Sequence, residues 1–222
     1  MRSILAGLAP WPDVDGLAPL VPRPTAVRVE RDAEIITQAA KAEYCYLVVT
    51  GCARTVRQIE DGRRQIGEFL LPGDLFGWET PAEYDFGAEA VVPTTLHRYE
   101  RHDLETFADR DRDFGRRLRA MMASRVRAGR EHIVLLGRKT SSERIACFLL
   151  DMAERMKLDG RARMELPMSH EDVADYLGLT IETVSRHLTR LRLHGTISVE
   201  RAKIMICDHQ GLEIAGNERA TL

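Results

Sequence analysis

The stretch of residues 169–195 constrains the fold more than any other part of the chain. Its pattern predicts a short helix that begins after a cap at Ser169, a tight turn at Gly178, and a second helix that begins after a cap at Thr180. Asp172 stands three residues after Ser169, at the spacing of a capping box. The apolar positions of the two helices can face one another, with Val173, Ala174 and Leu177 opposite Val184, Leu188 and Leu191. Two short helices joined in this way form a helix-turn-helix.

The second predicted helix carries a polar face that suits the major groove of DNA. Glu182, Ser185 and Arg186 lie at positions i, i+3 and i+4, so they project together. Arg186 can donate two hydrogen bonds to guanine, and Glu182 can accept one from cytosine N4. Ser185 is short enough to allow close approach to a base. An ordinary surface helix can also carry such a pair, but here the caps, the turn and a basic flank coincide with it. We therefore predict that these three residues read bases.

A local excess of positive charge follows the turn. The whole chain has a formal net charge of −2, but residues 183–203 contain five basic residues and a single acidic one. This excess predicts a phosphate-binding surface, with a merely solvated basic face as the alternative. His187 and His194 could add to the surface. The predicted phosphate contacts are Ser169, His170, Thr180, Thr183 and Arg190.

Composition argues against a secreted or membrane protein. A chain of 222 residues exceeds the usual size of one domain, which suggests two. The segment before Pro10 is too short and too weakly apolar for a signal peptide, and no run approaches the ~18 apolar residues of a membrane span. We therefore expect a cytoplasmic protein without membrane contact. The cysteines are scattered, as is typical of reduced thiols, and a redox role stays open for Cys45, Cys52, Cys147 and Cys207.

Motifs for metal binding and catalysis are missing from the sequence. The seven histidines lack the spacing of metal ligands. The chain has no glycine-rich phosphate loop, no nucleophile motif and no paired carboxylates at a recognisable spacing. We therefore expect no metal, no other cofactor and no enzymatic activity. A pure ligand-binding module is a further alternative, and the helix-turn-helix argues against it.

Residues 26–99 consist of short alternating runs separated by turn signals. One run ends at Gly51, the Asp61-Gly62 pair is a strong hairpin signal, and another run stops at Pro72-Gly73. Many short strands with such punctuation predict a sandwich or a roll. We assign this first domain to residues 1–102.

The turn signals then disappear, and apolar residues recur at helical spacing from Asp103 to Leu136. This spacing predicts one long amphipathic helix over residues 103–138. Its apolar stripe needs a partner, and a second copy of the helix in a coiled coil supplies one. The predicted dimer contacts are Leu118, Met121, Val126 and Leu136.

Residues 139–222 form the last predicted domain. A helix that begins near Ser142 leads into the helix-turn-helix. After Gly195, residues 196–199 and 203–207 alternate and predict a two-stranded wing. The domain is therefore expected to be a winged helix-turn-helix.

With these three parts in this order, the chain resembles the Crp/Fnr superfamily of bacterial transcription regulators over roughly residues 26–206. The resemblance implies an α+β fold, with an N-terminal cyclic-nucleotide-binding-like β-roll (jelly roll), a long dimerisation helix and a C-terminal winged helix-turn-helix. The last of the matching motifs is the most specific. These motifs are Tyr46–Gly51, Asp61-Gly62, Phe69–Gly77, Ser142–Ala146 and Leu177–Leu188.

The resemblance also implies a function. The Glu-x-x-Ser-Arg spacing at 182–186 is similar to the Fnr-type reader of TTGAT half-sites, whereas the cyclic-AMP receptor branch usually has an arginine at the position of Ile181. This implies a homodimer that binds a TTGAT-N4-ATCAA-like palindrome of double-stranded DNA and activates transcription. Exposed loops of the family contact RNA polymerase. The corresponding residues here are Glu79, Glu83 and Asp85, together with the stretch around 157–163.

Two departures from the family bear on what the protein senses. Cyclic-AMP binders hold the ring phosphate with an arginine, but residues 77–88 contain none, and Asp85 and Glu89 would repel an anion. Oxygen-sensing Fnr proteins carry an N-terminal cysteine cluster for an iron–sulfur centre, but residues 1–44 contain no cysteine. The chain therefore resembles the FixK-like branch, which lacks both devices. A regulator that senses a small effector in the cyclic-nucleotide manner is the alternative.

Overall fold

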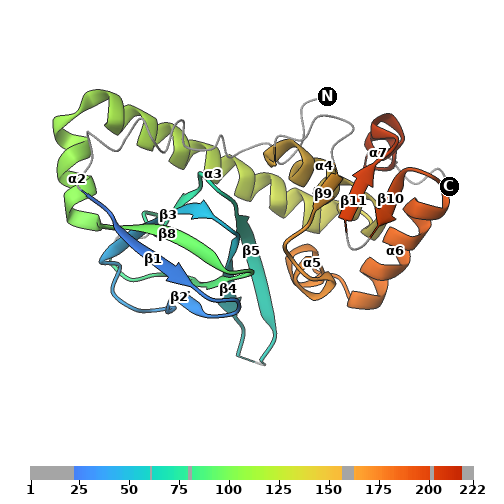
Figure 1. Cartoon of the computed structure of the whole chain (residues 1–222), viewed down its shortest axis with the longest axis horizontal. Coiled ribbons are helices and arrows are strands. Elements are labelled where there is room, and N and C mark those ends of the chain that lie inside the picture. Colours follow the sequence, from blue (N-terminus) through green and yellow to red (C-terminus); the bar gives the residue numbers. More distant parts are fainter. Residues whose placement is uncertain (1–22, 61, 80–81, 157–162, 201–202, 217–222) are drawn as a thin grey trace. The chain divides into compact units, whose positions relative to one another are not determined.

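The computed structural model describes residues 23–60, 62–79, 82–156, 163–200 and 203–216 (Figure 1). They fall into two compact units that divide after Arg125, inside a long helix. The predicted α+β fold is confirmed, with a β-roll before the long helix and a winged helix-turn-helix after it. In the ranges that the structure describes, no helix is long and apolar enough to cross a membrane.

Two antiparallel four-stranded sheets form the roll. The first has the strand order β1 (Thr25–Val29), β8 (Thr94–Glu100), β3 (Tyr44–Thr50) and β6 (Leu75–Phe76). The second has the order β2 (Glu34–Ile36), β7 (Gly87–Ala90), β4 (Ala53–Gln58) and β5 (Arg64–Leu70). Because side chains alternate between the faces of a strand, each sheet turns one apolar face to a shared core. That core includes Ile36, Val48, Leu70, Phe76 and Leu96.

The β4–β5 pair is the hairpin that the Asp61-Gly62 signal predicts. Gln58 lies opposite Arg64, and the pairing continues to Ala53 opposite Leu70. Gly62 has the positive φ of +85° that such turns require, while Asp61 lies outside the described residues. The turn signal therefore identifies the correct strand pair.

The prediction of a single helix over residues 103–138 is wrong in one respect. The structure has two helices, α2 (Arg101–Arg110) and α3 (Arg112–Arg138), separated by an extended Asp111. The Asp111 carboxylate accepts a 2.8 Å hydrogen bond from the Phe114 N–H and so caps α3, which helical periodicity does not reveal. A Cβ atom on Gly115 would lie 2.6 Å from the Ala108 carbonyl oxygen, so glycine permits the close approach of the two helices.

The start of α3 packs on the roll of its own chain. Leu118 is only 4 % exposed, and Met121 is half-buried at the edge of the same cluster. Leu118 is therefore covered by its own chain, and the dimer contact predicted there stays a prediction. The helical spacing predicts that the Leu118 side chain is buried, but it does not tell whether its own chain or a second chain buries it. The rest of the buried cluster consists of Cys45, Leu47, Leu75, Tyr99, Leu104 and Phe114.

The C-terminal unit combines helices with a three-stranded sheet. The helices are α4 (Ser141–Arg155), α5 (His170–Leu177), α6 (Ile181–Leu193) and α7 (His209–Ala215). The strands are β9 (Arg163–Glu165), β10 (Ile197–Glu200) and β11 (Lys203–Ile206), in the order β10-β11-β9. The sequence predicts only two strands for the wing. It misses β9 because a strand of three residues is too short to show alternation.

Candidate nucleic-acid interface

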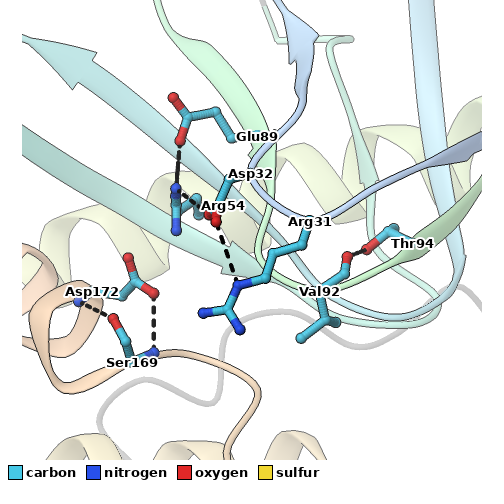
Figure 2. Close-up of polar contacts among 8 residues, drawn as sticks. All are labelled: Arg31, Asp32, Arg54, Glu89, Val92, Thr94, Ser169 and Asp172. Carbon is cyan, nitrogen blue, oxygen red and sulfur yellow. Dashed lines mark hydrogen bonds and ion pairs between the residues drawn. The ribbon is translucent and has the colours of Figure 1, made fainter.

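Local hydrogen bonds fix the start of each helix of the helix-turn-helix. The Ser169 hydroxyl accepts from the Asp172 N–H at 3.1 Å, and the Asp172 carboxylate accepts from the Ser169 N–H at 3.0 Å (Figure 2). The Thr180 hydroxyl accepts from the Thr183 N–H at 3.3 Å. Between the two helices, Gly178 is left-handed with φ +61° and ends α5. The caps and the glycine turn predicted from the sequence are confirmed, and each cap stabilises its helix by about 1 kcal/mol.

The first half of α6 exposes the three residues predicted to read bases. Glu182, Ser185 and Arg186 are all exposed, whereas the apolar residues on the opposite side of the helix are buried. Hydrogen bonds from its own backbone N–H and from the Thr180 hydroxyl lower the pKa of Glu182, so its carboxylate is ionised at neutral pH. The face therefore presents a charged acceptor beside a forked donor, which are the groups that read a G·C pair in the major groove.

The residues predicted to contact phosphate lie on the same two helices and their caps. His170 at the start of α5 and Arg190 on α6 are exposed. The Ser169 hydroxyl accepts its cap bond and keeps its own hydrogen to donate. The hydroxyl oxygens of Thr180 and Thr183 lie 3.1 Å apart, so one of these two hydroxyls donates to the other. Helix N-termini add backbone N–H groups that favour anions. Contact with phosphate stays a prediction.

His187, which could add to the phosphate-binding surface, is partly buried and contacts α4. Its Nε2 atom lies 3.0 Å from the Ser141 hydroxyl oxygen at the start of α4. Partial burial and the charges of Arg186 and Arg190 lower its pKa, so the ring is neutral at pH 7. His187 therefore ties α6 to α4 and brings no charge to the exposed face. His194 is exposed.

Arg144 of α4 holds the helix ends together and is not among the residues predicted to be functional from the sequence. Its guanidinium donates to the carbonyl oxygens of Leu136 at 2.6 Å, Lys139 at 2.9 Å and Leu177 at 2.8 Å. The last carbonyls of a helix have no partner within the helix, so this one side chain satisfies the ends of both α3 and α5. The available signal is the arginine within the Ser142–Ala146 motif.

His132 of α3 also packs against the helix-turn-helix. Its ring stacks on Tyr176 of α5 with centroids 4.4 Å apart, and Phe148 of α4 contacts the same tyrosine at 5.9 Å. Burial lowers the pKa of His132 to about 4, so the ring is neutral at pH 7. In the described ranges, no group of three or more His, Cys, Asp or Glu side chains could hold a metal ion.

In the roll, a buried arginine is already paired with acids. The Arg54 guanidinium lies 2.7 Å from a Glu89 carboxylate oxygen and 3.1 Å from one of Asp32 (Figure 2). Arg54 and Glu89 face one another across β4 and β7. The charge of Glu89, which was expected to repel an anion, is therefore matched by a cation from a neighbouring strand. Because two carboxylates of the roll already bind this guanidinium, it is not free to bind a phosphate group.

A second ion cluster joins the roll to the first half of α3. Arg125, whose side chain is 9 % exposed, contacts the Glu79 carboxylate and lies 3.0 Å from that of Glu68. Glu79 faces inward with 21 % of its side chain exposed. The Glu79 carboxylate is thus held within the chain, and the polymerase contact predicted there stays a prediction. Glu83 and Asp85 are exposed.

Comparison with known proteins adds two family matches. Residues 26–111 match the cyclic nucleotide-binding domain, and residues 143–214 match the Crp-like helix-turn-helix domain. The first match covers the roll. The second contains α5, α6 and the wing, where the capped helices and the exposed face of α6 lie.

Similar proteins cover most of the chain. The nitrogen fixation regulation protein FixK of Azorhizobium caulinodans is 44 % identical over 186 residues, which cover 82 % of this chain and 75 % of that protein. The transcriptional activator protein FnrL of Cereibacter sphaeroides is 35 % identical over 192 residues, covering 83 % and 77 %. The structure of FixK2 from Bradyrhizobium japonicum matches with a TM-score of 0.84 at 42 % identity, covering 89 % of this chain and 99 % of that one.

Proposed function

Because this chain belongs to the Crp/Fnr superfamily of transcription regulators, in its FixK-like branch, we propose that it is a homodimeric activator that reads a TTGAT-N4-ATCAA-like palindrome. The observation that carries the proposal is the joint exposure of Glu182, Ser185 and Arg186 on the first half of α6. A TTGAT half-site has one G·C pair. Its guanine acceptors suit the Arg186 fork, and its cytosine amino group suits the Glu182 carboxylate.

The remaining contacts are proposed to fix the position of the protein on DNA. Ser169, His170, Thr180, Thr183 and Arg190 supply hydroxyl, imidazole and guanidinium donors for phosphate oxygens. Such contacts orient a recognition helix and carry little sequence information. They make the affinity fall with salt, because each neutralised phosphate releases counterions.

Dimerisation is proposed to use the exposed side of α3. Val126 and Ile133 are 53 % and 71 % exposed and lie seven residues apart, which is one coiled-coil heptad. A Cβ atom at Gly129 would meet nothing within 4 Å, so this side of the helix is open. Large apolar side chains aligned on an exposed helix face are typical of an interface. Of the four residues predicted as dimer contacts, Val126 fits this face, while Met121 and Leu136 are half-buried.

Activation is proposed to involve a contact with RNA polymerase through the exposed acids Glu83 and Asp85. The second predicted loop is the stretch around residues 157–163, and all of it except Arg163 lies outside the described residues. The names of FnrL and other relatives as transcriptional activators support an activating role. The alternative of a cyclic-nucleotide-type sensor is less well supported, because Arg54 and Arg125 are both paired with carboxylates.

Fluorescence anisotropy with a labelled TTGAT-N4-ATCAA duplex tests the proposal. The control duplex carries a C·G pair in place of the G·C pair in both half-sites. Each mismatched pair costs ~1–3 kcal/mol, so we expect at least about 30-fold weaker binding to the control. Equal affinity for the two duplexes would refute base reading by α6.

A further inference from the structure

A cavity of about 490 Å³, open to the surface on one side, lies in the C-terminal unit and is bordered by α4, α5, α6 and the strands β10 and β11 (elements labelled in Figure 1). Small-molecule sites usually have volumes of roughly 300–1,000 Å³. The proposed reading of DNA does not require such a cavity. Its floor is apolar and includes the buried residues Phe148, Leu149, Val173, Leu188 and Ile204.

The residues that line the cavity include basic side chains but no acidic ones. Arg192 is the one lining residue that is always charged. Over the described parts of the chain, no carboxylate pairs with Arg192. Arg192 is exposed, so its guanidinium remains accessible to a bound molecule. The other polar groups are Ser169, His170, Ser185 and Thr189.

We propose that this cavity binds a small amphipathic carboxylate. The apolar body of the ligand lies on the floor between α4, α5 and α6, and its carboxylate accepts two hydrogen bonds from the Arg192 guanidinium. A planar guanidinium matches both oxygens of a carboxylate, which a single point charge cannot do. A neutral apolar molecule would leave this cation unpaired, and a cationic one would be repelled.

Occupation of the cavity is coupled to DNA binding, a step that rests on the proposed function. Ser169, His170 and Ser185 line the cavity and also belong to the surface proposed to contact DNA. A ligand beside these side chains competes with the nucleic acid for them. Coupling between two ligands is reciprocal, so DNA must weaken the carboxylate as much as the carboxylate weakens DNA.

Isothermal titration of the full chain with octanoate, without DNA, tests the site itself. We expect one octanoate per chain, and 1-octanol, which lacks the charge, should bind at least about tenfold more weakly. A hydrogen bond to a charged group contributes ~1.5–3 kcal/mol, which corresponds to a factor of ten or more. Arg192→Gln should weaken octanoate about tenfold and leave 1-octanol unchanged.

Two further variants separate the cavity from the rest of α6. Arg190→Gln is the matched control, because Arg190 is exposed on the same helix and does not line the cavity. It should leave octanoate binding unchanged. Thr189→Trp places a large ring at the exposed Thr189 position and should abolish binding of both ligands. If thermal unfolding shows that this variant does not fold, the comparison of octanoate binding by Arg192→Gln and Arg190→Gln tests the site instead.

The proposal is overturned if octanoate does not bind, or if it binds equally to wild type and Arg192→Gln, as it would on the apolar side of α3. In the anisotropy assay, saturating octanoate should raise the Kd for the palindrome about tenfold, within the usual range of coupling. If octanoate binds but does not change this Kd, the proposal that octanoate and DNA compete for the same side chains is overturned. Failure of the chain to bind DNA at all would count against the proposed function, and the titration would still report on the cavity.

Discussion

The Arg144 guanidinium donates a 2.8 Å hydrogen bond to the carbonyl oxygen of Leu177, the last residue of α5. The same group donates to Leu136 near the end of α3. One side chain of α4 thus fixes where the first helix of the helix-turn-helix ends relative to α3. Because α5 leads directly through Gly178 into α6, this contact also constrains the orientation of α6, the helix that we propose reads DNA.

Arg144→Ala should lower the free energy of unfolding by about 2–4 kcal/mol, because it leaves carbonyl groups at two helix ends without their charged donor. Urea denaturation measures the change. Arg138→Ala is the control, since Arg138 is exposed at the end of α3. Arg144→Lys should recover only part of the loss, because an ammonium group does not span three carbonyls. A midpoint equal to that of the control would contradict the role of Arg144.

Arg186→Ala should remove the preference for the TTGAT duplex over its control, at a cost of ~1–3 kcal/mol per half-site. Arg190→Ala should instead weaken binding to both duplexes and reduce the slope of log K against log salt by about one per subunit. Anisotropy titrations at several salt concentrations measure both effects. If the two variants showed the same profile, the division into base and phosphate contacts would be wrong.

Val126→Glu together with Ile133→Glu should convert the dimer to a monomer and weaken binding to the palindrome, because only a dimer engages both half-sites. Sedimentation velocity measures the mass, and circular dichroism checks the fold. Leu118→Glu is the contrasting variant. It buries a charge in the roll and should destabilise the chain by more than ~3 kcal/mol. A dimer that survives the double change would remove this side of α3 from the interface.

Cyclic AMP and cyclic GMP should change neither the Tm nor the affinity for DNA. A ligand that binds the native state raises stability by RT ln(1 + [L]/Kd), so millimolar nucleotide at a micromolar site would add ~4 kcal/mol. Arg54 and Arg125, which could meet a phosphate, are each held by two carboxylates. Differential scanning fluorimetry with each nucleotide is the measurement. A Tm increase of several degrees would support the alternative that the roll binds a cyclic nucleotide.

The stability of the C-terminal unit should fall as the pH drops from about 6.5 towards 4, because of His132. The folded pKa of His132 is lowered to about 4 by burial, while the unfolded chain keeps the ordinary value of 6.5. Between these values the unfolded state binds more protons, so acid favours unfolding by roughly 2–3 kcal/mol in total. His132→Phe keeps a ring against Tyr176 and should flatten this part of the pH profile. An unchanged slope in urea titrations of the variant would assign the pH dependence to other groups.

The helix-turn-helix could be predicted in detail because its signals are local. Ser169, Asp172 and Thr180 bond to groups three residues away, and Gly178 ends α5 through its own φ angle. Alternation and the Asp61-Gly62 turn were likewise sufficient for the β4–β5 pair. The exposed face of α6 follows from the same periodicity, since one side of the helix must be buried against α5.

What only the tertiary structure decided is which partner covers each face. Leu118 has the spacing of an interface residue, yet it is buried by the roll of its own chain. Glu79 stands in a loop that the sequence suggests is exposed, but Arg125 from α3, 46 residues along the chain, holds it inward. His187 likewise meets Ser141 across 46 residues. Periodicity records only that a side chain is apolar or charged, whereas burial and ion pairing depend on contacts between segments distant in sequence.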